Sequence, residues 1–204
     1  MSAESTLELL DWRRRVFALY AEVRATADPE AAWRHWRATR DELFRSHPQS
    51  PLPAAARARF AALDYFPYDP SYRVAAELRP LEAEPTPVAA SGGQTVLFRP
   101  FARASFTLRG EPAELDVHWL DAYGGGLFLP VRDATSGATS YGGGRYVLDT
   151  VKGADLGADG GRLVVDFNFA YNPSCAYDPG WVCPLAPPGN RLALAVEAGE
   201  RVPA

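Results

Sequence analysis

The C-terminal half of the chain concentrates side chains that could do chemistry on a small molecule. Its loops mix arginine, aspartate, tyrosine and asparagine with glycines, and glycine lets a backbone approach a ligand closely. Arginine can hold an anion, aspartate can orient that arginine, and tyrosine and asparagine hydrogen-bond to neutral groups. These residue types together predict a polar pocket built from loops. The candidates are Arg132, Asp133, Tyr141, Arg145, Asp166, Asn168, Tyr171, Asn172, Cys175 and Arg191.

The candidates divide by chemical role. Arg132 and Arg145 would hold an anionic or carbonyl group of the ligand. General acid–base chemistry, as in hydrolysis, elimination or isomerisation, needs a base and an acid within hydrogen-bond reach of that ligand. Asp133 or Asp166 would be the base, Tyr141 or Tyr171 would be the acid, and the other ligand contacts would come from Asn168, Asn172, Cys175 and Arg191.

A structural interpretation of the same residues stays open. Arg132 and Arg145 could pair with Asp133 and Asp166 only to hold long loops in place. Sequence alone cannot choose between a loop-pinning network and a ligand site, because it does not give distances.

Cys175 and Cys183 allow three interpretations. Seven residues separate them, so a disulfide is possible, but a reducing cytosol opposes it. Two thiols do not complete a zinc site, which needs about four ligands. A nucleophilic Cys175 would need a base or cation nearby, and no histidine follows it in the sequence. Buried or loop-stapling cysteines are therefore expected.

Motifs for nucleotide and metal binding are missing. Gly142–Arg145 precedes a predicted strand, whereas the Rossmann glycine motif follows one and opens a helix. Glu114, Asp116 and His118 share one face of a predicted strand, but positions on a single strand cannot surround an ion. We expect no metal and no cofactor.

The length of the chain and its net charge limit the classes of protein to which it could belong. The chain has 204 residues, which suits one domain. Its net charge is −4, and nucleic-acid binding usually needs a basic face, so no nucleic-acid partner is expected. The N-terminal residues lack a secretory signal, and no apolar run approaches the ~18 residues of a membrane span. A cytoplasmic protein without a membrane partner is expected, with a homodimer as one possibility.

Helices are predicted within residues 1–63. Ser5–Glu8 matches a capping box, and apolar residues then recur at helical spacing as far as Val23. Asp28 and Pro29 begin a second helix, since aspartate caps free amides and proline is tolerated in the first turn. A third, short helix is predicted over 54–63. The arginines here alternate with acidic residues, which is typical of a solvated helical face.

Strands are predicted in the β-rich part, residues 64–204, where the apolar period changes to two. Segment 81–93 is interpreted as a surface connection. Helices followed by many short strands favour an α+β protein with an antiparallel, barrel-like sheet. If that sheet closes, Asp166 and Asn168 would face its lumen. The predicted strands are 72–78, 95–98, 102–108, 113–120, 126–131, 145–151, 163–169 and 192–197.

Several motifs resemble the domain-of-unknown-function 1684 family, from the first helix to near the C-terminus. The resemblance implies a bacterial or archaeal protein of one domain and brings no established activity or cofactor. Phe169 stands where the family pattern would have lysine, so any role of that lysine is in doubt here. The motifs are Tyr65–Pro70, Arg132–Gly137, Tyr141–Tyr146, Asp166–Tyr177, Cys183–Pro184 and Asn190–Leu192.

Two functions of different classes follow. The first is a small-molecule-binding protein or an acid–base enzyme that uses the C-terminal loops. The second is an interaction protein whose tryptophan-rich helices pack on a partner, with the loop motifs serving only the fold. A polar, enclosed cavity lined by these loops would favour the first, and an exposed apolar helical face the second.

Overall fold

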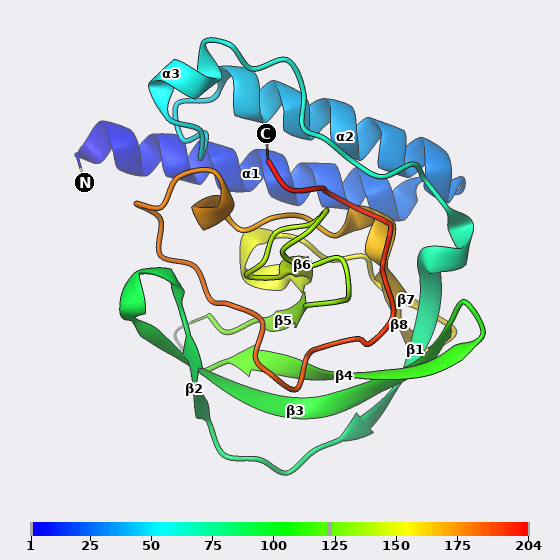
Figure 1. Cartoon of the computed structure of the whole chain (residues 1–204). Coiled ribbons are helices and arrows are strands. Elements are labelled where there is room, and N and C mark those ends of the chain that lie inside the picture. Colours follow the sequence, from blue (N-terminus) through cyan, green and yellow to red (C-terminus); the bar gives the residue numbers. More distant parts are fainter. Residues whose placement is uncertain (1, 122–123, 204) are drawn as a thin grey trace.

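The computed structural model describes residues 2–121 and 124–203, and it places a pair of helices across a curled antiparallel sheet (Figure 1). The α+β prediction is confirmed. Helix α1 spans Ala3–Ala25 and α2 spans Pro29–Ser46, and the two pack as an antiparallel hairpin over the sheet (Figure 1). Neither these helices nor any other in the described residues is long and apolar enough to cross a membrane.

The helix ends follow capping chemistry. Asp28 caps α2 as predicted, and its carboxylate accepts the Glu30 amide at 3.0 Å. The cap of helix α1 is Ser2, three residues before the predicted cap Ser5, and the Ser2 hydroxyl accepts the Ser5 amide at 3.1 Å. Helix α3 covers only Ala54–Arg57, so the prediction of a helix over 54–63 was too long.

The strands of the described residues form one open, half-barrel sheet with the order β6-β5-β4-β3-β1-β8-β7, and β2 pairs with β3. All of these pairs are antiparallel. The strands are β1 (Arg73–Pro80), β2 (Thr86–Ala89), β3 (Thr95–Leu108), β4 (Glu111–Leu120), β5 (Leu127–Val131), β6 (Arg145–Asp149), β7 (Ala158–Asp159) and β8 (Arg162–Asp166). The short 3₁₀ turns are η1 (Pro70–Tyr72), η2 (Ser91–Gly93), η3 (Thr150–Lys152), η4 (Phe167–Phe169) and η5 (Ser174–Ala176).

Most predicted strands are confirmed, with shifted ends. The two predicted strands over 95–108 are one strand with a bulge near Pro100, and β6 and β8 each end early in a 3₁₀ turn. The short strands β2 and β7 were not predicted. The prediction of a strand over 192–197 was wrong: much of the hydrogen bonding there is to side chains.

A buried arginine accounts for that irregular C-terminal segment. Arg145 on β6 is fully buried and forms an ion pair with Asp133 at 2.9 Å. Its guanidinium also donates to the carbonyls of Val196, Ala198 and Glu200. These bonds satisfy backbone oxygens that a neighbouring strand would otherwise have to satisfy. Arg145 therefore fixes the last segment of the chain across the sheet.

Aromatic side chains join the helices to the sheet. Trp36 of α2 is fully buried and meets Phe169 with ring centroids 5.2 Å apart. Trp33 is 5% exposed, and its indole donates to the Asn168 carbonyl at 2.9 Å. The tryptophans of α2 are thus part of the protein's own core.

Replacing Gly199 with alanine is expected to destabilise the fold strongly. Gly199 has φ of 76°, and an added Cβ would lie 2.5 Å from the Ala170 carbonyl oxygen and 2.6 Å from that of Phe167. Gly110 is a matched control, because its φ is 90° and nothing lies within 4 Å. We expect Gly199→Ala to lower the free energy of unfolding by ~3 kcal/mol and Gly110→Ala by ~1 kcal/mol. Urea denaturation measures both, and equal losses would contradict the predicted clash.

Replacing Arg145 with alanine is expected to cost ~3–5 kcal/mol of unfolding free energy, because it leaves Asp133 as an unpaired buried charge. Arg34 on α2 is a control with 62% of its side chain exposed, and Arg34→Ala should change stability by less than ~0.5 kcal/mol. The melting temperature and urea midpoint report both changes. An Arg145→Ala variant as stable as the wild type would show that the residue does not hold the fold.

Candidate functional site

The predicted site residues do not gather in one place. Arg145 and Asp133 form the buried hub described above, and Asp133 also accepts the amide and the hydroxyl of Thr135. Arg191 is exposed, and the contacts of Arg132 with the 190–192 segment are backbone hydrogen bonds. Among the described residues, neither arginine side chain forms a hydrogen bond or an ion pair, and Arg132 Nε is buried without a partner. The Arg145–Asp133 pair therefore holds the loops together, and Arg132 and Arg191 do not join it.

Asp166 and Asn168 form a second, separate cluster. Asn168 is fully buried; its amide donates to the Asp69 carbonyl at 2.9 Å and accepts the Asp69 amide at 3.0 Å. Asp166 accepts from Asn168 through one oxygen, and the other lies 3.6 Å from Arg73. Burial raises the pKa of Asp166. Asp166 and Asn168 together thus fix the turn that contains Asp69 to the end of β8.

Tyr171 and Asn172 do line a pocket, which we call the aromatic pocket. It lies between α1, α2 and the loop after η4, and its cavity volume is about 80 Å³. One water needs only ~10–15 Å³, so the pocket has room for several waters or a small ligand. It is lined by Trp12, Val16, Tyr20, Arg40, Phe44, Pro51, Tyr146, Lys152, Ala154, Tyr171, Asn172, Pro173, Ser174 and Tyr177.

A largely buried arginine, Arg40, forms the polar end of the aromatic pocket. Arg40 has 13% of its side chain exposed and pairs with Glu200, Nη2 to Oε2, at 2.9 Å. Its Nε donates to the Tyr65 hydroxyl at 3.1 Å. The guanidinium carbon lies 4.9 Å from the ring centre of Trp36 and 5.0 Å from that of Tyr171. Aromatic faces attract a cation, so the rings hold the guanidinium in position.

Glu200 connects the other polar groups around Arg40. It is 1% exposed; Oε2 also accepts the Asn172 amide at 3.0 Å, and Oε1 accepts the Tyr177 hydroxyl. Burial raises the pKa of Glu200, and the charge of Arg40 partly opposes that shift. A buried carboxyl with a raised pKa beside a pocket is a typical feature of acid–base sites.

Two buried polar atoms at the pocket wall lack a hydrogen-bond partner among the described residues: the hydroxyl of Tyr20 and Oδ1 of Asn172. The orientation of the Asn172 amide is fixed, because its Nδ2 donates to the Arg201 carbonyl at 2.7 Å. The Trp36 indole lies close enough to Tyr20 to affect its pKa, but its geometry completes no hydrogen bond. Unpaired buried polar groups are costly, so a ligand that pairs them would gain affinity.

The phenols of the pocket are proton donors at neutral pH. Burial raises the pKa of Tyr20 to about 12 and that of Tyr171 well above its ordinary value. At the rim, Lys152 is half-exposed and pairs with Asp149 at 3.2 Å. The pocket thus offers two phenols and a guanidinium as donors, with Asn172 as an acceptor.

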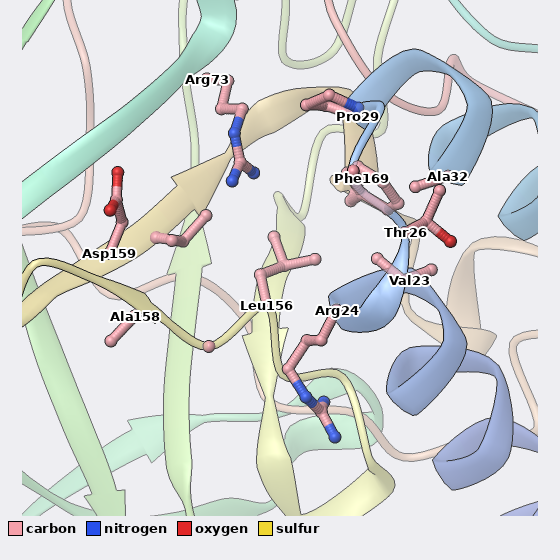
Figure 2. Close-up of a pocket in the computed structure, with 13 residues that line it drawn as sticks. Val23, Arg24, Thr26, Pro29, Ala32, Arg73, Leu156, Ala158, Asp159 and Phe169 are labelled. Atoms are coloured by element: carbon pink, nitrogen blue, oxygen red, sulfur yellow. The ribbon is translucent and has the colours of Figure 1, made fainter.

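A larger cleft, of about 380 Å³, lies between the start of α2 and strands β1, β7 and β8. Figure 2 shows the Arg73 side chain among the residues that line it, together with Leu156 and Phe169. Its charges are already offset: Arg24 pairs with the Asp155 carboxylate at 3.5 Å, and Arg73 pairs with Asp166 at 3.6 Å. Asp159 adds a negative charge at its wall. It is therefore the weaker candidate for a ligand site.

Tyr141 and Cys175 lie together, with the tyrosine hydroxyl 3.6 Å from the cysteine sulfur. Both cysteines are buried, and no disulfide joins them. Among the residues that the structure describes, no group of three or more His, Cys, Asp or Glu side chains could hold a metal.

The sequence interpretation missed Tyr20, Arg40, Tyr177 and Glu200. Arg40 was among the arginines assigned to a solvated helical face, and its burial corrects that assignment. One signal could have found it: Trp36, Arg40 and Phe44 are spaced four residues apart, so Arg40 lies on the apolar stripe of α2. Glu200 carries no comparable signal, because its partners come from distant parts of the chain.

Comparisons with known proteins agree with this fold. The chain is similar to an uncharacterised protein of Haloarcula marismortui solved by NMR in solution, with 39% sequence identity and a TM-score of 0.61. That alignment covers 88% of this chain and 97% of the other. No curated protein matches the chain. The family described as "Protein of unknown function (DUF1684)" matches residues 58–201, and the chain therefore belongs to that family.

Proposed function

We propose that this protein binds a small organic molecule with a carboxylate or carbonyl oxygen in the aromatic pocket. The observation that carries the proposal is the pair of buried, unpartnered polar atoms, Tyr20 Oη and Asn172 Oδ1, beside the buried Arg40. A wall of aromatic rings with few convergent polar groups is the usual composition of small-molecule sites.

The charges around the pocket limit the ligand. Arg40 is paired with Glu200, and Lys152 is paired with Asp149, so the pocket carries little net charge. A neutral ligand or a monoanion suits this balance better than a phosphate or a dianion does. An oxygen of the ligand would accept from Tyr20, Tyr171 or Arg40, and a ligand hydroxyl would donate to Asn172.

The same groups support acid–base chemistry on the bound molecule. Phenols that stay protonated at neutral pH can stabilise negative charge developing on a carbonyl oxygen. Tyr177 lines the pocket and donates to Glu200, so a proton could pass from ligand to Glu200 through that hydroxyl. Glu200 thereby replaces Asp133 and Asp166 as the proposed base, and Tyr171 stays the proposed acid. Hydrolysis, elimination and isomerisation all fit these roles.

The test is ligand-observed NMR on the full chain with acetate, glycolate, pyruvate and acetone as probes, after native mass spectrometry for a co-purified molecule. Arg40→Met should remove binding, whereas Arg34→Met on the exposed side of the same helix should keep it. Equal binding by both variants would overturn the assignment of Arg40. A bare chain or dimer that binds none of the probes would favour the alternative, an interaction protein.

Replacing Tyr20 with phenylalanine is expected to separate binding from stability. It removes a buried hydroxyl without a partner, so the unfolding free energy should rise by ~1 kcal/mol. Affinity for a carboxylate probe should fall roughly tenfold. Tyr65→Phe is the matched control, because that hydroxyl accepts from Arg40, and its loss should cost ~1 kcal/mol of stability. Thermal melts and probe titrations report these effects, and a less stable Tyr20→Phe protein would show that its hydroxyl is paired in the fold.

Replacing Glu200 with glutamine is expected to change how stability depends on pH. The folded state raises the pKa of Glu200 above 4.5, so the carboxyl contributes most stability when protonated, below 4.5. That contribution is lost as pH rises through the folded pKa. Glutamine does not titrate, so the variant should gain stability relative to the wild type as pH rises from about 4 to 8. Urea unfolding of both proteins across this range measures the difference, and an opposite slope would mean that the pKa is lowered.

A further inference from the structure

We propose that Arg132 and Arg191 together bind the phosphate group of a small molecule, at a site separate from the aromatic pocket. Arg191 is exposed and Arg132 is half-buried, and neither guanidinium has a hydrogen bond or an ion pair among the described residues. The site shares no residue with the aromatic pocket, so the two proposals stand independently.

Backbone hydrogen bonds place the two arginines side by side. The Arg132 amide donates to the Asn190 carbonyl at 2.9 Å, and the Leu192 amide donates to the Arg132 carbonyl at 2.8 Å. These bonds form a parallel bridge between Arg132 and Arg191. Residues bridged in this way lie on backbones about 4.8 Å apart and point their side chains to the same face. Both guanidiniums can therefore reach one oxyanion.

Asn190 fixes the segment that carries Arg191. Asn190 is fully buried, and its Nδ2 donates to the carbonyls of Asp116 at 2.8 Å and Pro130 at 2.9 Å. Its Oδ1 accepts the Asp116 amide at 3.2 Å. Successive residues of an extended segment point to opposite faces, so Arg191 points away from these contacts and towards solvent.

A glycine makes room for the side chain of Arg132. At Gly144, which has φ of 95°, an added Cβ would lie 3.0 Å from Cγ of Arg132 and 2.8 Å from Cβ of Ala186. The arginine stem is thus packed before a ligand binds, which reduces the entropy lost on binding. Its Nε is buried without an acceptor, and an unmet buried donor is costly. An oxyanion at this position would supply the missing acceptor.

The acidic residues that adjoin these two segments are already paired. Asp133 follows Arg132 in the chain, but its carboxylate belongs to the buried ion pair with Arg145 at 2.9 Å. Asp116 contacts the neighbouring segment, but its Oδ1 accepts from Arg103 at 2.8 Å. Like charges directly opposite each other on neighbouring strands repel. A bound anion would remove that repulsion.

The two unpaired charges favour a phosphate over a carboxylate. A guanidinium presents parallel N–H donors that match the oxygens of an oxyanion. A phosphate dianion offsets both positive charges, whereas a carboxylate offsets one. The whole chain has a net charge of −4, and nucleic acid usually needs a broad basic face. A phosphate carried by a small molecule therefore fits the site better than a nucleic-acid backbone does.

The test titrates the full-length protein with inorganic phosphate and phenyl phosphate at constant ionic strength, with chloride and acetate as reference anions. Phosphate at about ten times its Kd should raise the melting temperature by ~3–6 °C, because it binds the folded state. The Nε–H resonance of Arg132 should shift over the same titration. Acetate should shift that resonance only at roughly tenfold higher concentration.

The variants are Arg132→Gln and Arg191→Gln, and each should weaken phosphate binding roughly tenfold. Arg34→Gln, with 62% of the wild-type side chain exposed, is the matched control and should keep phosphate binding. Arg40→Met should keep it too, which separates this site from the aromatic pocket. Without phosphate at low salt, Arg191→Gln should melt no lower than the wild type, because it removes a repulsion.

Four results would overturn the proposal. Equal effects of phosphate and chloride would show screening alone, and unchanged binding in both glutamine variants would place phosphate elsewhere. A fall in the melting temperature of Arg191→Gln without phosphate would give that residue a role in the fold. Tighter binding of an oligonucleotide than of phenyl phosphate would make nucleic acid the ligand. Arg191 is exposed, so its variant decides the question even if Arg132→Gln does not fold.

Discussion

The ion pair between Arg40 and Glu200 joins parts of the chain that the sequence keeps far apart. Arg40 comes from α2, and Glu200 lies four residues from the C-terminus. The loop with Asn172 and Tyr177 closes over the same carboxylate. A buried ion pair is tolerated only when its remaining hydrogen-bonding atoms are satisfied, and here tyrosines and a backbone amide provide those partners. Helices, loop and C-terminus therefore depend on one another at this point.

Arg145 also holds the C-terminal segment in place, through the backbone of that segment. It donates to the carbonyl of Glu200, while Arg40 holds the side chain of the same residue. Gly199, just before it, has a positive φ and lies too close to the carbonyls of Phe167 and Ala170 for any side chain. Two buried guanidiniums and one glycine thus fix Glu200 beside the pocket. That rigidity is what a binding or acid–base site requires of its polar groups.

The motif residues of the C-terminal half fall into two groups: those that bond to one another and to the backbone, and those that line the aromatic pocket. The residues around Asp133, Arg145 and Asn168 bond mainly to one another and to the backbone, as the loop-pinning interpretation requires, although Arg145 Nε and Asp166 Oδ2 have no hydrogen-bond partner among the described residues. Tyr171 and Asn172 differ, because they face a cavity in which some polar atoms have no partner in the described fold. The aromatic rings of α1 and α2 cover that cavity. The helices therefore serve both the core and the proposed site.

Local chemistry in the sequence determined the helices, most strands and the α+β class. Capping at Asp28 and the change of period near residue 72 depend only on neighbours along the chain. The motif residues could be identified as important from the sequence, but their roles could not. An arginine and an aspartate give the same sequence signal whether they belong to a buried structural network or to a ligand pocket. Tertiary structure alone decided that Arg40 is buried, that Glu200 meets it, and that 192–197 is not a strand. The physical reason is distance: these contacts join residues more than 50 positions apart, and burial by distant segments sets their charge and pairing.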